Sequence, residues 1–201
     1  MSPKQAEIAL NEFYLATSQL CKLLENASLF SKRVYLSSLH KMLGLVYLKA
    51  SLIENASESD TGDPEKFVQE SDWIFVKEQI SSRLGVLDQY IEIPISEGNV
   101  PDNFEALTLS EALADIYQDL KDFSTNYEFG NEEAIGAALY SCMDNFPEYW
   151  GLRVLAVLTS LHLILYNADL DENDAEDLQD NKQNPDADKT KDWLINKRFN
   201  N

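Results

Sequence analysis

The sequence predicts an all-α fold: a bundle or irregular array of about six helices, followed by an acidic C-terminal tail. Glycine and proline are scarce, at 7 and 6 of 201 residues, so turn-forming positions are few and long elements are favoured. Apolar residues recur at helical spacing as far as about residue 168. Beyond it, the chain is rich in Asp, Asn and Gln. We therefore expect one helical domain over residues 1–168 and a flexible acidic tail over residues 169–201.

The first two helices are expected at residues 3–26 and 31–55. Pro3 suits the first position of a helix, and apolar residues follow at helical period in both segments. The connection between them is short, which predicts antiparallel pairing. A polar, acidic loop is expected at residues 54–70.

The third helix is expected at residues 71–91, because apolar residues from Val76 to Ile91 follow a 4-4-3-4 spacing. Pro94 ends it, and residues 94–103 read as an irregular connection.

The fourth helix has the clearest start. Thr108 and Glu111 form a capping box, in which each side chain bonds the other residue's backbone amide, and Gly130 ends the helix. The fifth and sixth helices are expected at residues 131–146 and 148–168, separated by Pro147. The sixth is apolar on almost all sides, which favours a central core helix over a membrane span.

The charge excludes some partners. A net charge of −19 and a pI of about 4.3 repel nucleic acids and anionic membranes. Protein partners, basic ones in particular, remain compatible, as do cationic small molecules and divalent metals. The oligomeric state is open. The first residues contain no basic segment followed by an apolar run, so we expect a cytoplasmic protein.

Cys21 and Cys142 lie among apolar residues at helical spacing, and we expect reduced thiols in the core.

A candidate pocket is predicted between the fourth and sixth helices. A buried guanidinium needs a carboxylate, so Arg153 should meet Asp115 or Asp119. The pocket would be lined by polar and aromatic residues of both helices: Asp115, Tyr117, Asp119, Tyr149, Trp150, Arg153 and His162. The favoured interpretation of this set is a buried salt bridge that fixes the register of the helices.

The acidic row of the fourth helix consists of Glu111, Asp115, Asp119 and Asp122. We favour a solvated helix face over a metal or acid–base site for these residues. A di-iron site would need Glu-x-x-His units, and neither histidine, His40 or His162, lies in one. The stretch from Asp169 begins like a calcium loop but lacks the required Gly and Glu. We predict no metal, no cofactor and no catalytic residue.

Two strings resemble a known family. Residues 113–123, and residues 145–151 followed by Leu161-His162, are similar to an uncharacterised bacterial family, the domain of unknown function numbered 5063, found largely in Bacteroidetes. The resemblance covers most of the chain up to about Ala168 and is strongest in its second half. It implies a helical fold and a bacterial cytoplasmic protein, and it implies no activity.

Three functions stay open. The leading hypothesis is a non-enzymatic protein-interaction module, and the alternative is a small-molecule or divalent-metal binding protein that uses the candidate pocket. The third is a subunit whose exposed apolar stripe is completed by self-association.

An apolar patch lies near the end of the tail, where Lys197 and Arg198 are close in sequence to Trp193, Leu194, Ile195 and Phe199. This apolar patch is expected to dock on the body or on a partner.

Overall fold

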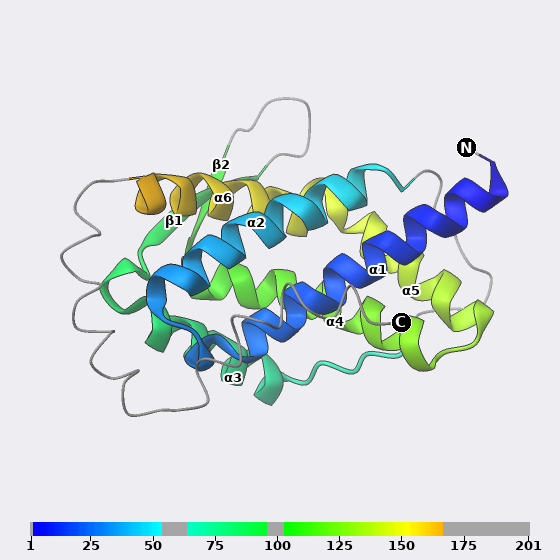
Figure 1. The fold of residues 1–201 in the computed structure, drawn as a ribbon, viewed down its shortest axis with the longest axis horizontal. Coiled ribbons are helices and arrows are strands. Elements are labelled where there is room, and N and C mark those ends of the chain that lie inside the picture. The colour runs from blue at the N-terminus through cyan, green and yellow to red at the C-terminus, as the bar shows by residue number, and fades with distance from the viewer. Residues whose placement is uncertain (1, 54–63, 96–102, 167–201) are drawn as a thin grey trace, which may run out of the picture.

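A computed structural model describes residues 2–53, 64–95 and 103–166. Helices dominate it, and the predicted all-α class is confirmed (Figure 1). In chain order, the elements are α1 (Pro3–Glu25), α2 (Lys32–Ser51), α3 (Glu70–Leu84), β1 (Tyr90–Ile95), β2 (Asn103–Thr108), α4 (Leu109–Phe129), α5 (Glu132–Asp144) and α6 (Gly151–Tyr166). The predicted acidic tail, and most of the predicted loop after α2, lie outside the described residues.

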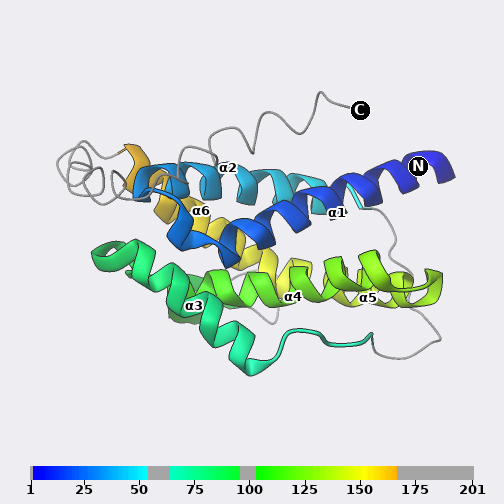
Figure 2. The ribbon, with the colours of Figure 1, turned by 60° about the horizontal axis from the view of Figure 1, so that its bottom comes forward.

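Helix α4 is the central element of the fold. It packs against α1, α3, α5 and α6, while α2 packs against α1 and α6. Figure 2 shows α1 and α2 on one side of the molecule and α3, α4 and α5 on the other, with α6 running between them. Aromatic rings stack in the core: Phe13 lies with its ring centroid 5.0 Å from that of Phe123 and 6.4 Å from that of Trp150.

The capping box of α4 is present as predicted. The Thr108 hydroxyl accepts from the amide of Glu111, and the Glu111 carboxylate accepts from the amide of Thr108. A second capping box, formed by Ser2 and Gln5, begins α1. Local sequence therefore determines where both helices begin.

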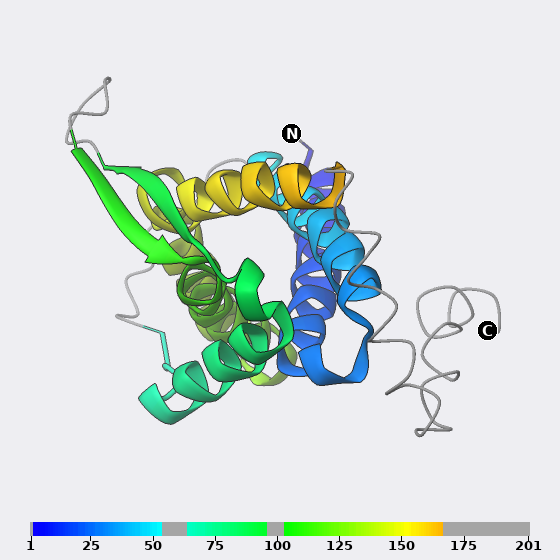
Figure 3. The ribbon, with the colours of Figure 1, turned by 90° about the vertical axis from the view of Figure 1, so that its left-hand side faces the viewer.

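The third predicted helix is too long. Of the predicted irregular connection, residues 94, 95 and 103 belong to strands, and residues 96–102 lie outside the described residues. Helix α3 ends at Leu84, where Gly85 adopts a positive φ of 57°. Residues after it form an antiparallel ribbon in which Tyr90 pairs with Thr108 and Ile95 with Asn103. Ile91 and Ile93 turn their side chains into the core, and the ribbon lies against α6 (Figure 3).

Pro147 does not separate two helices in the way the sequence suggested. The amides of Tyr149 and Trp150 both donate to the carbonyl of Asn145, at 3.0 and 3.2 Å, which makes residues 146–150 a π-helical turn leading into α6. A Cβ on Gly151 would lie 2.2 Å from the carbonyl oxygen of Phe146, so only glycine fits this turn.

Helix α6 is not surrounded by protein on all sides, which corrects the prediction of a fully buried core helix. One face is buried, but Leu155, Leu163 and Tyr166 are 43%, 65% and 73% exposed. Among the described residues, only the helical segment Glu132–Tyr166 is long and apolar enough to span a membrane. It contains an 18-residue window with a mean hydropathy of 1.4, and a third of that window is buried. Core helices of soluble proteins pass the same test, so this segment alone decides nothing about a membrane.

Candidate functional site

Arg153 forms the polar centre of the predicted site. It is buried on α6, and its Nε donates to Asp115 Oδ2 at 3.0 Å, which confirms the predicted contact between α4 and α6. Its Nη2 donates to Glu105 Oε2 on β2 at 2.7 Å, and its guanidinium lies 3.7 Å from the ring centroid of Tyr149. Burial, followed by the charge of Asp115, raises the pKa of Tyr149. Three elements thus enclose one guanidinium, and its charge is neutralised by two carboxylates.

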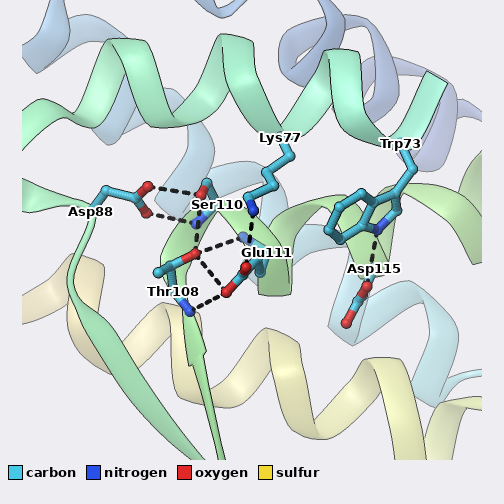
Figure 4. A network of polar contacts seen from close by, with 7 residues as sticks. All are labelled: Trp73, Lys77, Asp88, Thr108, Ser110, Glu111 and Asp115. Atoms are coloured by element: carbon cyan, nitrogen blue, oxygen red, sulfur yellow. Dashed lines mark hydrogen bonds and ion pairs between the residues drawn. The ribbon is translucent and has the colours of Figure 1, made fainter. Parts of the chain in front are cut away.

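The other oxygen of Asp115 faces α3. Trp73 donates its indole N–H to Asp115 Oδ1 at 3.0 Å, and Lys77 pairs with Glu111 at 2.9 Å (Figure 4). The capping bond from Thr108, followed by the contact with Lys77, lowers the pKa of Glu111. The ribbon joins the same network, because Asp88 accepts from both the amide and the hydroxyl of Ser110 (Figure 4).

Tyr117 belongs to a separate contact, on the side of α4 that faces α1. Its hydroxyl donates to Glu25 Oε1 at 2.9 Å, and Lys121 pairs with the same oxygen at 2.6 Å. Burial and the negative charge of Glu25 raise the pKa of Tyr117. The residue fixes α1 to α4.

Asp119 lies in a third place. Its Oδ1 accepts from Asn145 Nδ2 at 2.9 Å, and its Oδ2 is buried without a hydrogen-bond partner. Desolvation raises its pKa. It lines a small cavity of about 10 Å³ with Lys66, Asp122 and Cys142, whereas Asp115 lines a different cavity, of about 360 Å³, beside Trp73.

Asp122 completes the acidic row and is 3% exposed. Its Oδ1 accepts from the amides of Phe67 and Val68, at 2.7 and 2.9 Å, and Asn126 donates to the carbonyl of Glu65. The extended segment before α3 is therefore held onto α4 by side chains. The predicted solvated face is wrong, because every carboxylate of the row is directed at another element.

Trp150 and His162 do not line a pocket with the others. Trp150 is fully buried and donates its indole N–H to the carbonyl of Cys142 at 2.7 Å. His162 is exposed, and it lies nine residues after Arg153, on the side of α6 opposite to that residue. Within the described residues, the seven predicted residues are thus spread over several separate contacts, and Asp115 and Asp119 line different cavities.

The partners of these residues were not found from the sequence. Glu105, Trp73, Glu25 and Asn145 each complete one of the contacts, and each lies more than 20 positions from its partner. Of these four partners, only Glu105 lies in a local pattern that could have indicated its position, the alternation of apolar and polar residues in a strand. Within the described residues, no group of three or more His, Cys, Asp or Glu side chains is arranged to hold a metal ion.

An open apolar groove lies elsewhere, between α2 and α6. Its volume is about 680 Å³, and it is lined by His40, Lys41, Gly44, Leu155, Leu158, Thr159, His162 and Leu163. Gly44 leaves room along α2, since a Cβ there would meet no atom within 4 Å. At one end, His162 lies 6.0 Å from His40 and 4.6 Å from Tyr166 between ring centroids. The only two histidines of the chain therefore meet here.

We define the α2–α6 face as the residues lining this groove together with Leu45, Leu48 and Tyr166. Leu45 and Leu48 are 38% and 53% exposed, and each lies four residues after a residue that lines the groove. Neither α2 nor α6 contains an Asp or Glu, while α2 carries three lysines and one arginine. In a chain of net charge −19, this face is apolar and free of carboxylates.

Cys21 and Cys142 are buried free thiols, as predicted. Burial raises the pKa of Cys21 to about 12 and raises that of Cys142 strongly. Neither is suited to nucleophilic chemistry at neutral pH, because the thiolate is the reactive form.

The fold and these contacts define a class: a helical domain whose buried charged residues Arg153, Asp115 and Asp122 contact other elements, and whose α2–α6 groove is open and largely apolar. The chain belongs to the family described as Domain of unknown function (DUF5063), whose model matches residues 5–167. The crystal structure of protein BF1032 from Bacteroides fragilis is similar, with a TM-score of 0.69 and 28% sequence identity. The match covers 79% of this chain and 93% of that chain. No curated protein matches the chain.

Proposed function

We propose that the protein is a non-enzymatic protein-interaction module of the bacterial cytoplasm, and that it binds its partner through the α2–α6 face. The observation that carries the proposal is the exposed, carboxylate-free apolar surface around the groove. Soluble proteins seldom leave such a surface open unless it contacts something. The charge of the chain adds to this, because the face is where another macromolecule meets the least negative charge.

The chemistry of the face also indicates what a partner would present. Leu155, Leu158 and Leu163 favour an apolar side chain inserted into the groove. Lys41 and the two histidines favour polar or acidic groups around that side chain. The basic partner considered from net charge alone would instead meet the acidic surfaces outside this face.

Support for the alternative, a small-molecule or metal site at the predicted pocket, is weaker. The polar atoms of Arg153, Asp115 and Tyr117 contact other parts of the chain, as does Oδ1 of Asp119. A ligand at this place would have to break those contacts, and each broken buried contact lowers affinity.

The experiment compares two exposed apolar residues changed to the same charge. Leu163→Glu places a carboxylate on the α2–α6 face, and Phe129→Glu places one at the end of α4, where the side chain is 77% exposed. Each protein is used to capture partners from a bacterial lysate, and a captured protein is then purified and its Kd measured. We expect a partner that binds the native protein and the Phe129→Glu variant but binds the Leu163→Glu variant at least tenfold more weakly.

Two further measurements can contradict the proposal. One is the thermal unfolding midpoint against a panel of divalent metals and metabolites, with the Asp115→Ala, Arg153→Ala double variant as control. A selective rise of the midpoint that the double variant loses would favour the ligand-binding alternative. The other is sedimentation with vesicles of anionic phospholipid, where binding that depends on Leu163 would make the face a membrane contact.

A further inference from the structure

An open apolar face and an apolar segment of sequence occur in the same chain. The face is the groove between α2 and α6. The segment is Trp193–Phe199, which holds four large apolar residues. In residues 171–192, which precede it, the only large apolar residue is Leu178. We propose that Trp193–Phe199 of the same molecule binds in the α2–α6 groove. The inference deepens the proposed function, because it names an occupant of the same face.

Helix α6 ends beside the groove. Tyr166 is the last residue of α6, and its ring contacts His162 at the rim. Twenty-six residues lie between Tyr166 and Trp193, and a flexible chain of that length spans roughly 25–30 Å on average. The groove lies within this reach, because its lining on α6 extends only from Leu155 to Leu163. Tethering raises the effective concentration of the segment to about the millimolar range.

Charge directs the tail to this face. The connecting stretch, residues 169–192, holds ten Asp and Glu and three Lys. The helical domain is itself acidic, so most of its surface repels this stretch. The α2–α6 face repels it least, because α2 and α6 carry no Asp or Glu and Lys41 is exposed there. The acidic stretch therefore favours the surface of α2 and α6 over the remaining surfaces, and the apolar segment provides the contact there.

The groove suits an aromatic side chain. Its floor is open over Gly44, where no side chain fills the space, and leucines line the opposite wall. The rings of His40, His162 and Tyr166 lie together at one end and offer flat surfaces for the indole of Trp193.

A spin label on the full chain tests the contact directly. Cys21 and Cys142 are 1% and 3% exposed, so a cysteine introduced as Asn200→Cys takes the label selectively. The labelled, isotope-enriched protein is diluted with unlabelled, unenriched chain, so that only effects within one molecule are recorded. We expect the amide resonances of Gly44 and Leu163 to lose most of their intensity, and that of Gly136 on α5 to keep it.

Matched variants connect the effect to the groove. Gly44→Leu fills the groove and should restore the lost intensity, whereas Gly136→Leu should leave the loss unchanged, since both glycines are helical and neither Cβ would meet an atom within 4 Å. Changing Trp193, Leu194 and Ile195 to Ser should also restore the intensity, without touching the described body. Lys41→Glu should reduce the loss of resonance intensity at Gly44 and Leu163. Lys4→Glu, at the N-terminal end of α1, should leave that loss unchanged.

Three results would overturn the inference. The first is no loss at the groove, and the second is an equal loss over all surfaces. The third is a loss seen only when labelled unenriched chain is mixed with unlabelled enriched chain, which would make a second copy the occupant. These outcomes leave the partner experiment untouched, so failure of the tail contact and failure of the proposed function are distinguishable. If both proposals hold, the triple Ser variant should bind the partner more tightly than the native chain does, because the tail no longer competes.

Discussion

The acidic row of α4 and the α2–α6 face differ in a way that reverses the expectation from sequence. The row consists of charged residues at helical spacing, which usually means a wet surface, yet all four are partly or fully buried and bonded to other elements. The α2–α6 face consists largely of apolar residues, which usually means core, yet much of it is exposed. In these two regions, residue type therefore does not predict exposure: the carboxylates of the row contact other elements, and leucines of the α2–α6 face are exposed.

The largest effect on the free energy of unfolding should come from replacing Arg153, which contacts two carboxylates and one aromatic ring. Arg153→Ala leaves Asp115 and Glu105 without their cation, and we expect it to lower the free energy of unfolding by about 3 kcal/mol, with Glu105 contributing little because it is 37% exposed. Urea unfolding of the native protein and the variant measures the change.

A double-mutant cycle distinguishes the pair from simple loss of packing. The Asp115→Ala, Arg153→Ala double variant should lose less stability than the sum of the two single variants, because the second change removes an already unpaired charge. Additive losses would mean that the two side chains contribute separately and that the ion pair does not stabilise the fold.

The same contrast explains what the sequence could predict. The helices and the capping box of Thr108 follow from local spacing, and local rules were sufficient. The predicted third helix was extended over Tyr90 and Ile91, the first two residues of β1, because Leu87 and Ile91 continue the apolar stripe of α3. The alternation of Ile91, Ile93 and Ile95 is the local signal for a strand that this prediction missed. The partners of the acidic row depend on packing between distant elements, which no local pattern contains.

His162 shows why the candidate pocket was harder to predict than the fold. Helix α6 is apolar on all sides, so its sequence does not say which side faces the core. Only the packing of α2 and α4 against it decides that Arg153 is buried and His162 is exposed. The contact of Arg153 with Asp115 could be predicted because a buried guanidinium requires a carboxylate, whichever way the rest of the helix faces.

Asp122 should show the next largest effect, and a local one. Asp122→Ala removes the acceptor of the Phe67 and Val68 amides, and we expect a loss of about 2 kcal/mol in unfolding free energy. Hydrogen exchange of these two amides should rise more than that of the core amides of α4. Asp122→Asn keeps one acceptor oxygen and should lose less. Equal losses for both variants would show that the charge, and not the acceptor geometry, matters.

Two glycines test the comparison with the smallest possible change. Gly44→Ala, in the open groove, should stabilise the protein by about 1 kcal/mol, since alanine favours a helix. Gly151→Ala should destabilise it by about 2 kcal/mol, because the new Cβ would clash with the carbonyl oxygen of Phe146. Thermal unfolding of both variants measures the difference. A loss of stability in Gly44→Ala would mean that the added methyl group meets an atom over α2, from the described helices or from the Trp193–Phe199 segment.

The smallest effects should come from two carboxylates of the row that titrate in opposite directions. The pKa of Asp119 is raised in the folded protein, so its protonated form is favoured there, and its contribution to stability rises as the pH falls through the folded pKa towards the unfolded pKa. The pKa of Glu111 is lowered, so its contribution is present above the unfolded pKa and is lost as the pH falls through the folded pKa. Unfolding free energy measured from neutral to acidic pH should therefore fall more steeply in Asp119→Asn than in the native protein. It should fall less steeply in Glu111→Gln, and parallel curves for both variants would mean that neither carboxylate is perturbed by its contacts.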